Sequence, residues 1–122
     1  MHTNESAENY LETILILSQE HPVVRSVDIA EEMGFSKPSV SVAMKHLREK
    51  GHISVSREGY ITLTESGREI AEMIYERHQF LSAWLESLGI PGETAVRDAC
   101  RMEHVISPET FAALKEYLHS EK

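Results

Sequence analysis

The sequence predicts a mainly helical fold with one short β-hairpin near its middle. Six segments place apolar residues three or four positions apart, which is the spacing of one face of an α-helix. Residues 53–63 instead alternate apolar and polar side chains, which is typical of strands. The 122 residues are enough for one domain or two small ones.

Three helices are predicted in the first part of the chain, where serine, glycine and proline mark their ends. We expect Ser26 and Ser36 to cap the second and third helices, and Gly34 to end the second. Pro38 lies in the first turn of the third helix, where its missing N–H costs nothing. The predicted helices span residues 7–20, 27–33 and 37–50. The second and third helices, joined by a short turn, form a helix-turn-helix.

A β-hairpin and three more helices follow. The strands Ile53–Arg57 and Tyr60–Leu63 are separated by Glu58 and Gly59, which predicts a two-residue hairpin loop. Three helices followed by a hairpin is the order of a winged helix-turn-helix. Thr64 is expected to cap a long helix, and the last three helices span residues 65–88, 93–105 and 108–119. The predicted fold class is mainly α, a winged helix-turn-helix followed by an all-helical domain.

The charge of the chain is unevenly distributed. The formal net charge is -8, which taken alone argues against a nucleic-acid partner. Residues 36–58, however, carry five basic and two acidic side chains, whereas both flanking regions are acidic. The basic stretch coincides with the third helix and the hairpin. We find no apolar run of about 20 residues and no leader segment, and therefore expect a cytoplasmic protein without a membrane partner.

The third helix is predicted to present one face to DNA. Its apolar side chains occupy one arc and are expected to be buried: Val40, Ala43, Met44 and Leu47. On the opposite face, small hydroxyl groups permit close approach to base edges, Lys45 can reach a phosphate, and Val42 can contact a thymine methyl group. The alternative is an ordinary solvated helix face. The residues expected to contact DNA are Ser36, Lys37, Pro38, Ser39, Ser41, Val42, Lys45, His46 and Arg57, the last at the hairpin tip.

Polar residues interrupt two apolar faces in the second half. The stripe of the long helix contains His78 and is otherwise apolar: Ile70, Ile74, Leu81, Leu85 and Leu88. A flanking row suits a partner chain: Met73, Phe80 and Trp84. One face of the fifth helix combines two apolar side chains with three metal-ligand types: Val96, Ala99, Cys100, Glu103 and His104.

These polar residues predict a metal site. The open alternative is that His78 is a hydrogen-bonded core residue and that the single cysteine, Cys100, is a buried packing residue. Metal binding is favoured because four such residues lie on faces that should be apolar: His78, Cys100, Glu103 and His104. Thiolate, imidazole and carboxylate together suit Fe(II), Co(II), Ni(II) or Zn(II), whereas Mn(II) prefers oxygen and imidazole.

The sequence resembles the diphtheria toxin repressor and manganese transport regulator family of metal-dependent transcriptional repressors. The segments that carry the resemblance are Ala7–Glu12, Asp28–Glu31, Pro38–Val40, Leu63–Thr64 with Gly67–Arg68, Arg77–His78 and Cys100–His104. The match extends over nearly the whole chain, and the Cys-x-x-Glu-His run is its specific part. The resemblance implies a winged helix-turn-helix DNA-binding domain over residues 1–72 and a helical dimerisation and metal-binding domain over residues 73–122.

The resemblance also implies which residues bind metal. His78 matches a ligand of both family branches, and Glu12 matches one of the manganese-type branch. Asn9 stands where the family has Met or Asp, and it offers only a neutral amide oxygen. Three positions match the regulatory ligands of the iron-type branch: Cys100, Glu103 and His104.

A second metal is possible in only one of the two family forms. The ancillary site of the iron-type branch uses an acid and a histidine, but Ser82 and Val96 occupy those positions here. A second metal bridged by Glu12, His78 and Glu103, as in the manganese-type branch, remains open. The metal's identity is therefore open as well.

We expect a homodimeric, metal-activated repressor that binds double-stranded operator DNA. Fe(II) or Mn(II) is the expected metal, and Co(II), Ni(II) or Zn(II) is expected to occupy the site in vitro. No small organic substrate and no enzymatic activity are expected. The alternatives are a winged-helix regulator that does not respond to metal, an adaptor protein, and a small metallohydrolase, for which the sequence offers no second catalytic constellation.

Overall fold

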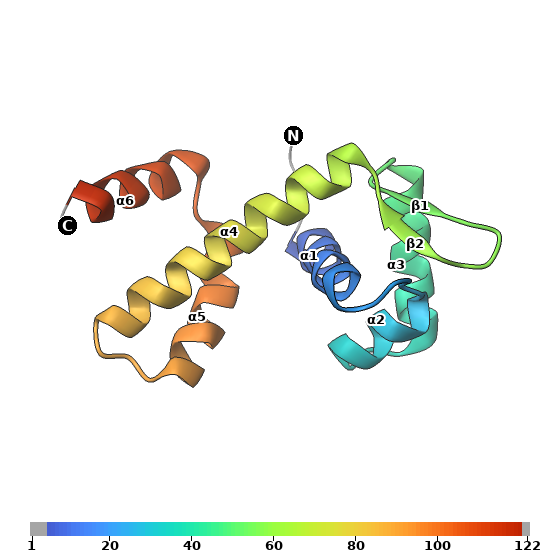
Figure 1. Ribbon diagram of the computed structural model, residues 1–122, viewed down its shortest axis with the longest axis horizontal. Helices are drawn as coiled ribbons and strands as arrows, with labels where there is room; N and C mark the ends of the chain where they lie inside the picture. The colour runs from blue at the N-terminus through green and yellow to red at the C-terminus, as the bar shows by residue number, and fades with distance from the viewer. Residues whose placement is uncertain (1–4, 121–122) are drawn as a thin grey trace. The chain divides into compact units, whose positions relative to one another are not determined.

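The computed structural model describes residues 5–120, with side chains as far as residue 118, and the chain divides into two compact units, residues 1–73 and 74–122. In chain order the elements are α1 Glu5–Glu20, α2 Ser26–Met33, α3 Lys37–Glu49, β1 Ile53–Val55, β2 Ile61–Leu63, α4 Glu65–Ser87, α5 Gly92–Val105 and α6 Pro108–Ser120 (Figure 1). The predicted mainly helical class with one hairpin is confirmed. No helix in the described part of the chain has the length and apolar character needed to cross a membrane.

The residues predicted to cap or end the second and third helices do so, except at the start of α2. Ser36 caps α3, because its hydroxyl accepts the backbone N–H of Ser39 at 3.3 Å. Gly34 ends α2 in the left-handed conformation, with φ 71°. The prediction that Ser26 caps α2 is wrong, because Ser26 is already helical and Arg25 is the N-cap. The backbone N–H of Arg25 is bound by a carboxylate three residues further on, at 2.9 Å.

The hairpin has a longer loop than predicted. The strands pair antiparallel with Val55 opposite Ile61, and Ser56 and Tyr60 extend the ladder by one more hydrogen bond. The loop therefore has three residues and not two, because Gly59 occupies its third position with φ 86° and donates its N–H to the Ser56 carbonyl. This loop is the wing of the first unit, and Figure 1 shows the hairpin extending from the three helices.

The first unit is held together by one apolar core. The inner sides of α1, α2 and α3 and one face of the hairpin supply fully or nearly fully buried side chains: Leu11, Ile14, Leu15, Leu17, Ile29, Ala30, Val40, Met44, Leu47, Ile53 and Ile61. The buried arc predicted for α3 is confirmed, with Ala43 half-buried at its edge. Burying this face leaves the opposite face of α3 exposed to solvent.

Gly67 is required where the wing meets the first turn of α4. Thr64 caps α4 and donates its hydroxyl to the carbonyl oxygen of Gly51 at 2.6 Å, which draws the two segments together. A Cβ atom on Gly67 would overlap the carbonyl oxygen of His52, and the neighbouring atoms there are backbone. Any side chain at this position must therefore displace the chain that leads into the wing.

We expect Gly67→Ala to lower the free energy of unfolding of the first unit by about 2–3 kcal/mol. Thermal and urea unfolding followed by circular dichroism measure this change. The matched control is Gly92→Ala, since a Cβ on Gly92 would lie 3.1 Å from Glu86 Oε1, an atom of a flexible side chain. Equal stability of the two variants would contradict the proposed close contact at Gly67.

The second unit has a separate core between the later part of α4 and α5. Four side chains form its centre: Leu81, Leu85, Ala95 and Ala99. Phe80 and Trp84, predicted to face a partner chain, are partly buried against this cluster. Leu88, predicted to belong to the buried stripe, is 61% exposed because α4 ends at Ser87. On α6, Phe111 packs edge-on against Phe80, with 5.4 Å between the ring centroids.

Candidate metal centre and nucleic-acid interface

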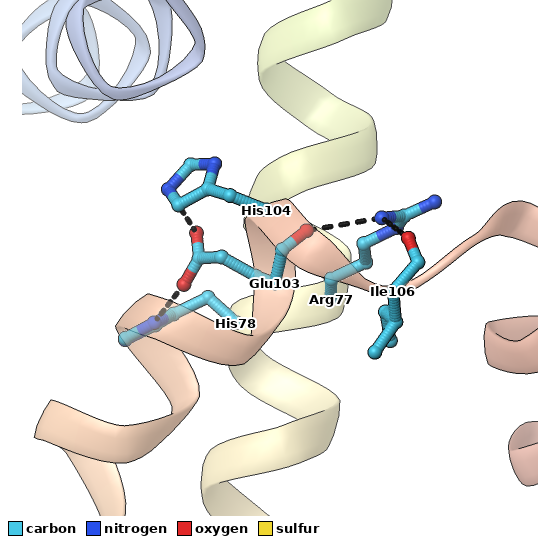
Figure 2. A network of polar contacts seen from close by, with 5 residues as sticks. All are labelled: Arg77, His78, Glu103, His104 and Ile106. Carbon is cyan, nitrogen blue, oxygen red and sulfur yellow. Dashed lines mark hydrogen bonds and ion pairs between the residues drawn. The ribbon is translucent and has the colours of Figure 1, made fainter. Parts of the chain in front are cut away.

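Three side chains with metal-ligand chemistry meet in the second unit. His78 comes from α4, and Cys100 and Glu103 come from α5, where a spacing of three residues places both on neighbouring positions of one face. One ligand atom from each residue lies within 4.8 Å of the other two. His78 Nδ1 lies 2.8 Å from Glu103 Oε1, and Figure 2 shows these two side chains pointing toward one another. The structure thus brings together three of the six predicted ligands.

The carboxylate of Glu103 is buried and only half satisfied. Its side chain is 0% exposed, and only Oε1 has a hydrogen-bond partner among the described residues. Oε2 forms an ion-pair contact with Nε2 of His104 at 3.8 Å, which is beyond hydrogen-bonding distance. A buried carboxylate oxygen without a hydrogen bond costs free energy, and a cation at this position would remove that cost.

The three donors fit a divalent transition metal. Metal–ligand bonds to nitrogen, oxygen and sulfur are about 2.0–2.3 Å long, so ligand atoms a few ångströms apart can share one ion after small adjustments. Thiolate, imidazole and carboxylate donors suit Fe(II), Co(II), Ni(II) and Zn(II), and the oxygen and nitrogen donors also suit Mn(II). Each ligand binds metal in its deprotonated form, so a bound ion would compete with the proton between His78 and Glu103.

Cys100 is exposed, contrary to the prediction that it lies on a buried stripe. Val96, four residues earlier, is also exposed, at 45%. The buried side of α5 is instead formed by Ala95, Ala99 and Glu103, so the helix is rotated relative to the predicted stripe. The alternative that Cys100 is a buried packing residue is therefore wrong within this unit, and its sulfur lies at the solvent side of the donor group.

The other three predicted ligands lie outside the three-donor group. His104 follows Glu103 on α5 and approaches its second carboxylate oxygen. Asn9 and Glu12 lie three residues apart on α1, in the first unit, where Glu12 is buried and Asn9 is half-buried. The participation of these three residues in metal binding stays a prediction.

Arg77 is buried beside the donor group. Its Nη1 donates to the carbonyl oxygens of Glu103 and Ile106, at 3.0 and 2.9 Å (Figure 2). The guanidinium carbon also lies 5.4 Å from the centroid of the Phe111 ring. Arg77 was not predicted to have a role of its own, and its position next to His78 in the sequence was the available signal.

The predicted DNA-facing residues are all at the surface of the first unit. Val42 is 56% exposed, although it is apolar, and the buried side of α3 lies opposite. The exposed positions are Ser36, Lys37, Pro38, Ser39, Ser41, Val42, Lys45, His46 and, in the wing loop, Arg57. The accessibility that DNA contact requires is therefore present at each of these residues.

A basic groove lies beside this face. Its volume is about 150 Å³, and it is lined by Ser26, Ser41, Met44, Lys45, Arg48 and Val55, from α2, α3 and β1. The lining contains two cations and no acidic side chain. Arg48 is one of the five bases of residues 36–58 but was not predicted to contact DNA, although its spacing of three residues from Lys45 places it on the same side of α3.

A winged helix-turn-helix with a basic exposed face, joined to a helical unit that holds a transition-metal donor group, defines a metal-responsive DNA-binding regulator. Two family models match the chain. Residues 2–61 match the N-terminal DNA binding domain of the iron dependent repressors. Residues 64–121 match their metal binding and dimerisation domain. The chain belongs to the diphtheria toxin repressor and manganese transport regulator family of metal-dependent transcriptional repressors.

Individual relatives agree with this family assignment. The transcriptional regulator MntR of Escherichia coli O6:H1 is 37% identical over 114 residues, which cover 93% of this chain and 74% of MntR. The iron-dependent repressor IdeR of Mycobacterium bovis is 31% identical over 117 residues, covering 95% of this chain and 51% of IdeR. A solved manganese-dependent transcriptional repressor in complex with manganese superimposes with a TM-score of 0.82 at 30% identity, covering 93% of this chain and 52% of that one. The chain spans about half the length of the last two proteins.

Proposed function

We propose that this chain is a homodimeric cytoplasmic repressor that binds operator DNA when a divalent metal occupies the His78, Cys100 and Glu103 centre. The observation that carries the proposal is the buried Glu103 carboxylate, which has one oxygen on His78 and the other without a hydrogen-bond partner in the described part of the chain. No catalytic role is proposed, because the matching family models describe DNA binding, metal binding and dimerisation.

DNA binding belongs to the first part of the chain, and dimerisation and metal binding belong to the second. Residues 1–72 bind DNA, and residues 73–122 form the dimer and bind metal. The family models that match residues 2–61 and 64–121 support this division. His104, together with Glu12 or Asn9 from α1, completes the metal ligands, so that occupancy of the centre fixes the DNA-binding part relative to the dimer.

The metal acts by shifting a conformational population. The bound ion favours the arrangement in which the two α3 helices of a dimer reach adjacent major grooves, about 34 Å apart. Linkage then requires operator DNA to tighten metal binding by the same factor by which metal tightens DNA binding. The surplus of acidic side chains outside residues 36–58 limits non-specific binding to DNA.

Fe(II) and Mn(II) are the proposed physiological metals. The names of the relatives support both, since one is an iron-dependent repressor and one solved relative is a manganese-dependent repressor in complex with manganese. The thiolate of Cys100 favours Fe(II) over Mn(II). Co(II), Ni(II) and Zn(II) are expected to occupy the same centre in vitro.

Calorimetric titration under anaerobic conditions tests the metal centre directly. We expect saturable binding of Fe(II), Mn(II) and Co(II), with one or two ions per chain and with affinity that falls below neutral pH, because the ligands must lose their protons. A chain that binds none of these ions, yet binds DNA, would be a winged-helix regulator that does not respond to metal.

A further inference from the structure

Arg77 holds the end of α5 in place. The last four carbonyl groups of a helix have no partner within the helix, and the Glu103 carbonyl is one of these. Arg77 Nη1 donates to this oxygen at 3.0 Å and to the Ile106 oxygen just beyond the helix at 2.9 Å. A cation at a helix C-terminus is favourable, and here it is only 5% exposed, so solvent screens the interaction little.

The residue whose backbone Arg77 binds is also a proposed metal ligand. Glu103 presents its carbonyl oxygen to Arg77 and its carboxylate to His78, which is the next residue after Arg77 on α4. Adjacent residues of one helix therefore hold both ends of Glu103 (Figure 2). Any shift of the last turn of α5 along α4 would change the separation between the His78 and Glu103 donors.

Arg77 is in turn fixed by α6. The guanidinium carbon lies 5.4 Å from the Phe111 ring centroid, and Lys115 Nζ lies 5.5 Å from the same centroid. Lys115 also pairs with Glu76 of α4 at 2.6 Å. The ring limits the positions that the guanidinium can take, since cation–π contact favours one placement over the ring.

From these contacts we propose that Arg77 is a positioning residue of the metal centre. It touches no donor atom, and it sets the geometry of the centre by fixing the backbone of Glu103 against α4. A metal site needs its donors held within about 0.5 Å of their bonding positions, so an anchor on the backbone of a ligand changes metal affinity. This inference rests on the proposed metal centre and adds a residue outside the predicted ligands.

Cobalt(II) binding to the dimer of this chain under anaerobic conditions tests the role of Arg77. The visible d–d bands report the coordination geometry, and the near-ultraviolet charge-transfer band reports the bond to the Cys100 thiolate. We expect Arg77→Met to lower cobalt affinity about 10–100-fold and to alter both spectra, with Arg77→Lys between Met and wild type. The control, Lys115→Met, removes the other cation from the Phe111 ring and the ion pair with Glu76, and should change affinity less than about twofold.

Each outcome of this experiment decides the inference. If Arg77 had only a structural role, its replacement would lower the stability of the metal-free protein and leave the spectra of the cobalt-loaded protein unchanged. Unchanged spectra would therefore overturn the proposal. If Arg77→Met does not fold, Arg77→Lys decides, because affinity and spectra equal to those of wild type would overturn it too. A wild-type dimer without a cobalt–thiolate band would overturn the proposed metal centre itself, and this inference with it.

Discussion

Glu103→Gln should abolish the response to metal while leaving a folded dimer. The glutamine has nearly the same shape, and its carbonyl oxygen can still accept a hydrogen bond from His78 Nδ1 in place of the present 2.8 Å contact. It removes an anionic ligand, and even partners outside the ligand shell contribute about 10–100-fold to metal affinity. We therefore expect a loss of at least about 100-fold in affinity for Fe(II), Mn(II) and Co(II).

The metal-free stability of the same variant separates a ligand from a structural carboxylate. The substitution removes a buried charge of which one oxygen lacks a hydrogen bond, and this gain offsets the weaker pairing with His78. The melting temperature without metal should therefore change little. Wild type should be stabilised by about 2.7 kcal/mol when the free metal is 100 times its dissociation constant, and the variant should show no such gain. Differential scanning calorimetry with and without metal measures both quantities.

Glu116→Gln is the matched control for this experiment. It makes the same chemical change at an exposed position on α6. The control should keep both the affinity and the stabilisation by metal. If Glu103→Gln also keeps them, the proposed centre is wrong and the buried carboxylate has another purpose.

Lys45→Glu should weaken binding to operator DNA more than any other single exposed substitution on α3. Lys45 is exposed and lines the basic groove with Arg48, and the replacement puts an anion against the phosphate backbone in both halves of a dimer. We expect an affinity loss of about 100-fold near 0.1 M salt. The plot of log affinity against log salt concentration should become less steep, its slope decreasing in magnitude by about 2, one for each lost phosphate contact.

Arg97→Glu controls for the change in overall charge. Arg97 is exposed on α5, so the substitution changes the net charge by the same amount at a position outside the proposed interface. Fluorescence anisotropy with a labelled duplex at several salt concentrations compares the two variants. An equal loss of DNA affinity in both variants would mean that the groove on α3 has no specific contact with DNA and that only net charge determines the affinity.

The helices could be predicted from sequence because the signals that define them are local. Ser36 and Thr64 cap the helices that follow them, and Gly34 provides the left-handed residue that ends α2. The hairpin loop is one residue longer than predicted, because Ser56 and not Arg57 bonds to Tyr60, and the alternation of apolar residues does not fix this pairing.

The candidate metal centre was predicted only in part, for a geometric reason. Helical spacing places Cys100, Glu103 and His104 near one another, but it does not fix which side of α5 is buried. The small side chains Ala95 and Ala99 decide this, because they allow α5 to pack against Leu81 and Leu85. As a result Glu103 is buried while Cys100 is exposed.

The contacts of Arg77 were beyond sequence analysis altogether. Its partners are backbone carbonyl oxygens that lie 26 and 29 residues further along the chain. Backbone groups carry no sequence signal, so only the packing of α4 against α5 reveals which side chain satisfies them. The same limit applies to Gly67, whose neighbour is the carbonyl oxygen of His52.

A titration of operator DNA with and without metal tests whether metal controls DNA binding by this chain. A fluorescent duplex, selected from a random pool by the manganese-loaded protein, is titrated with the wild-type chain under anaerobic conditions, first with a chelator and then with Fe(II) or Mn(II). We predict that metal tightens binding by at least about 10-fold, within the usual range of allosteric coupling, and that the chelator reverses the effect. Equal affinity for the duplex with chelator and with metal would contradict the claim.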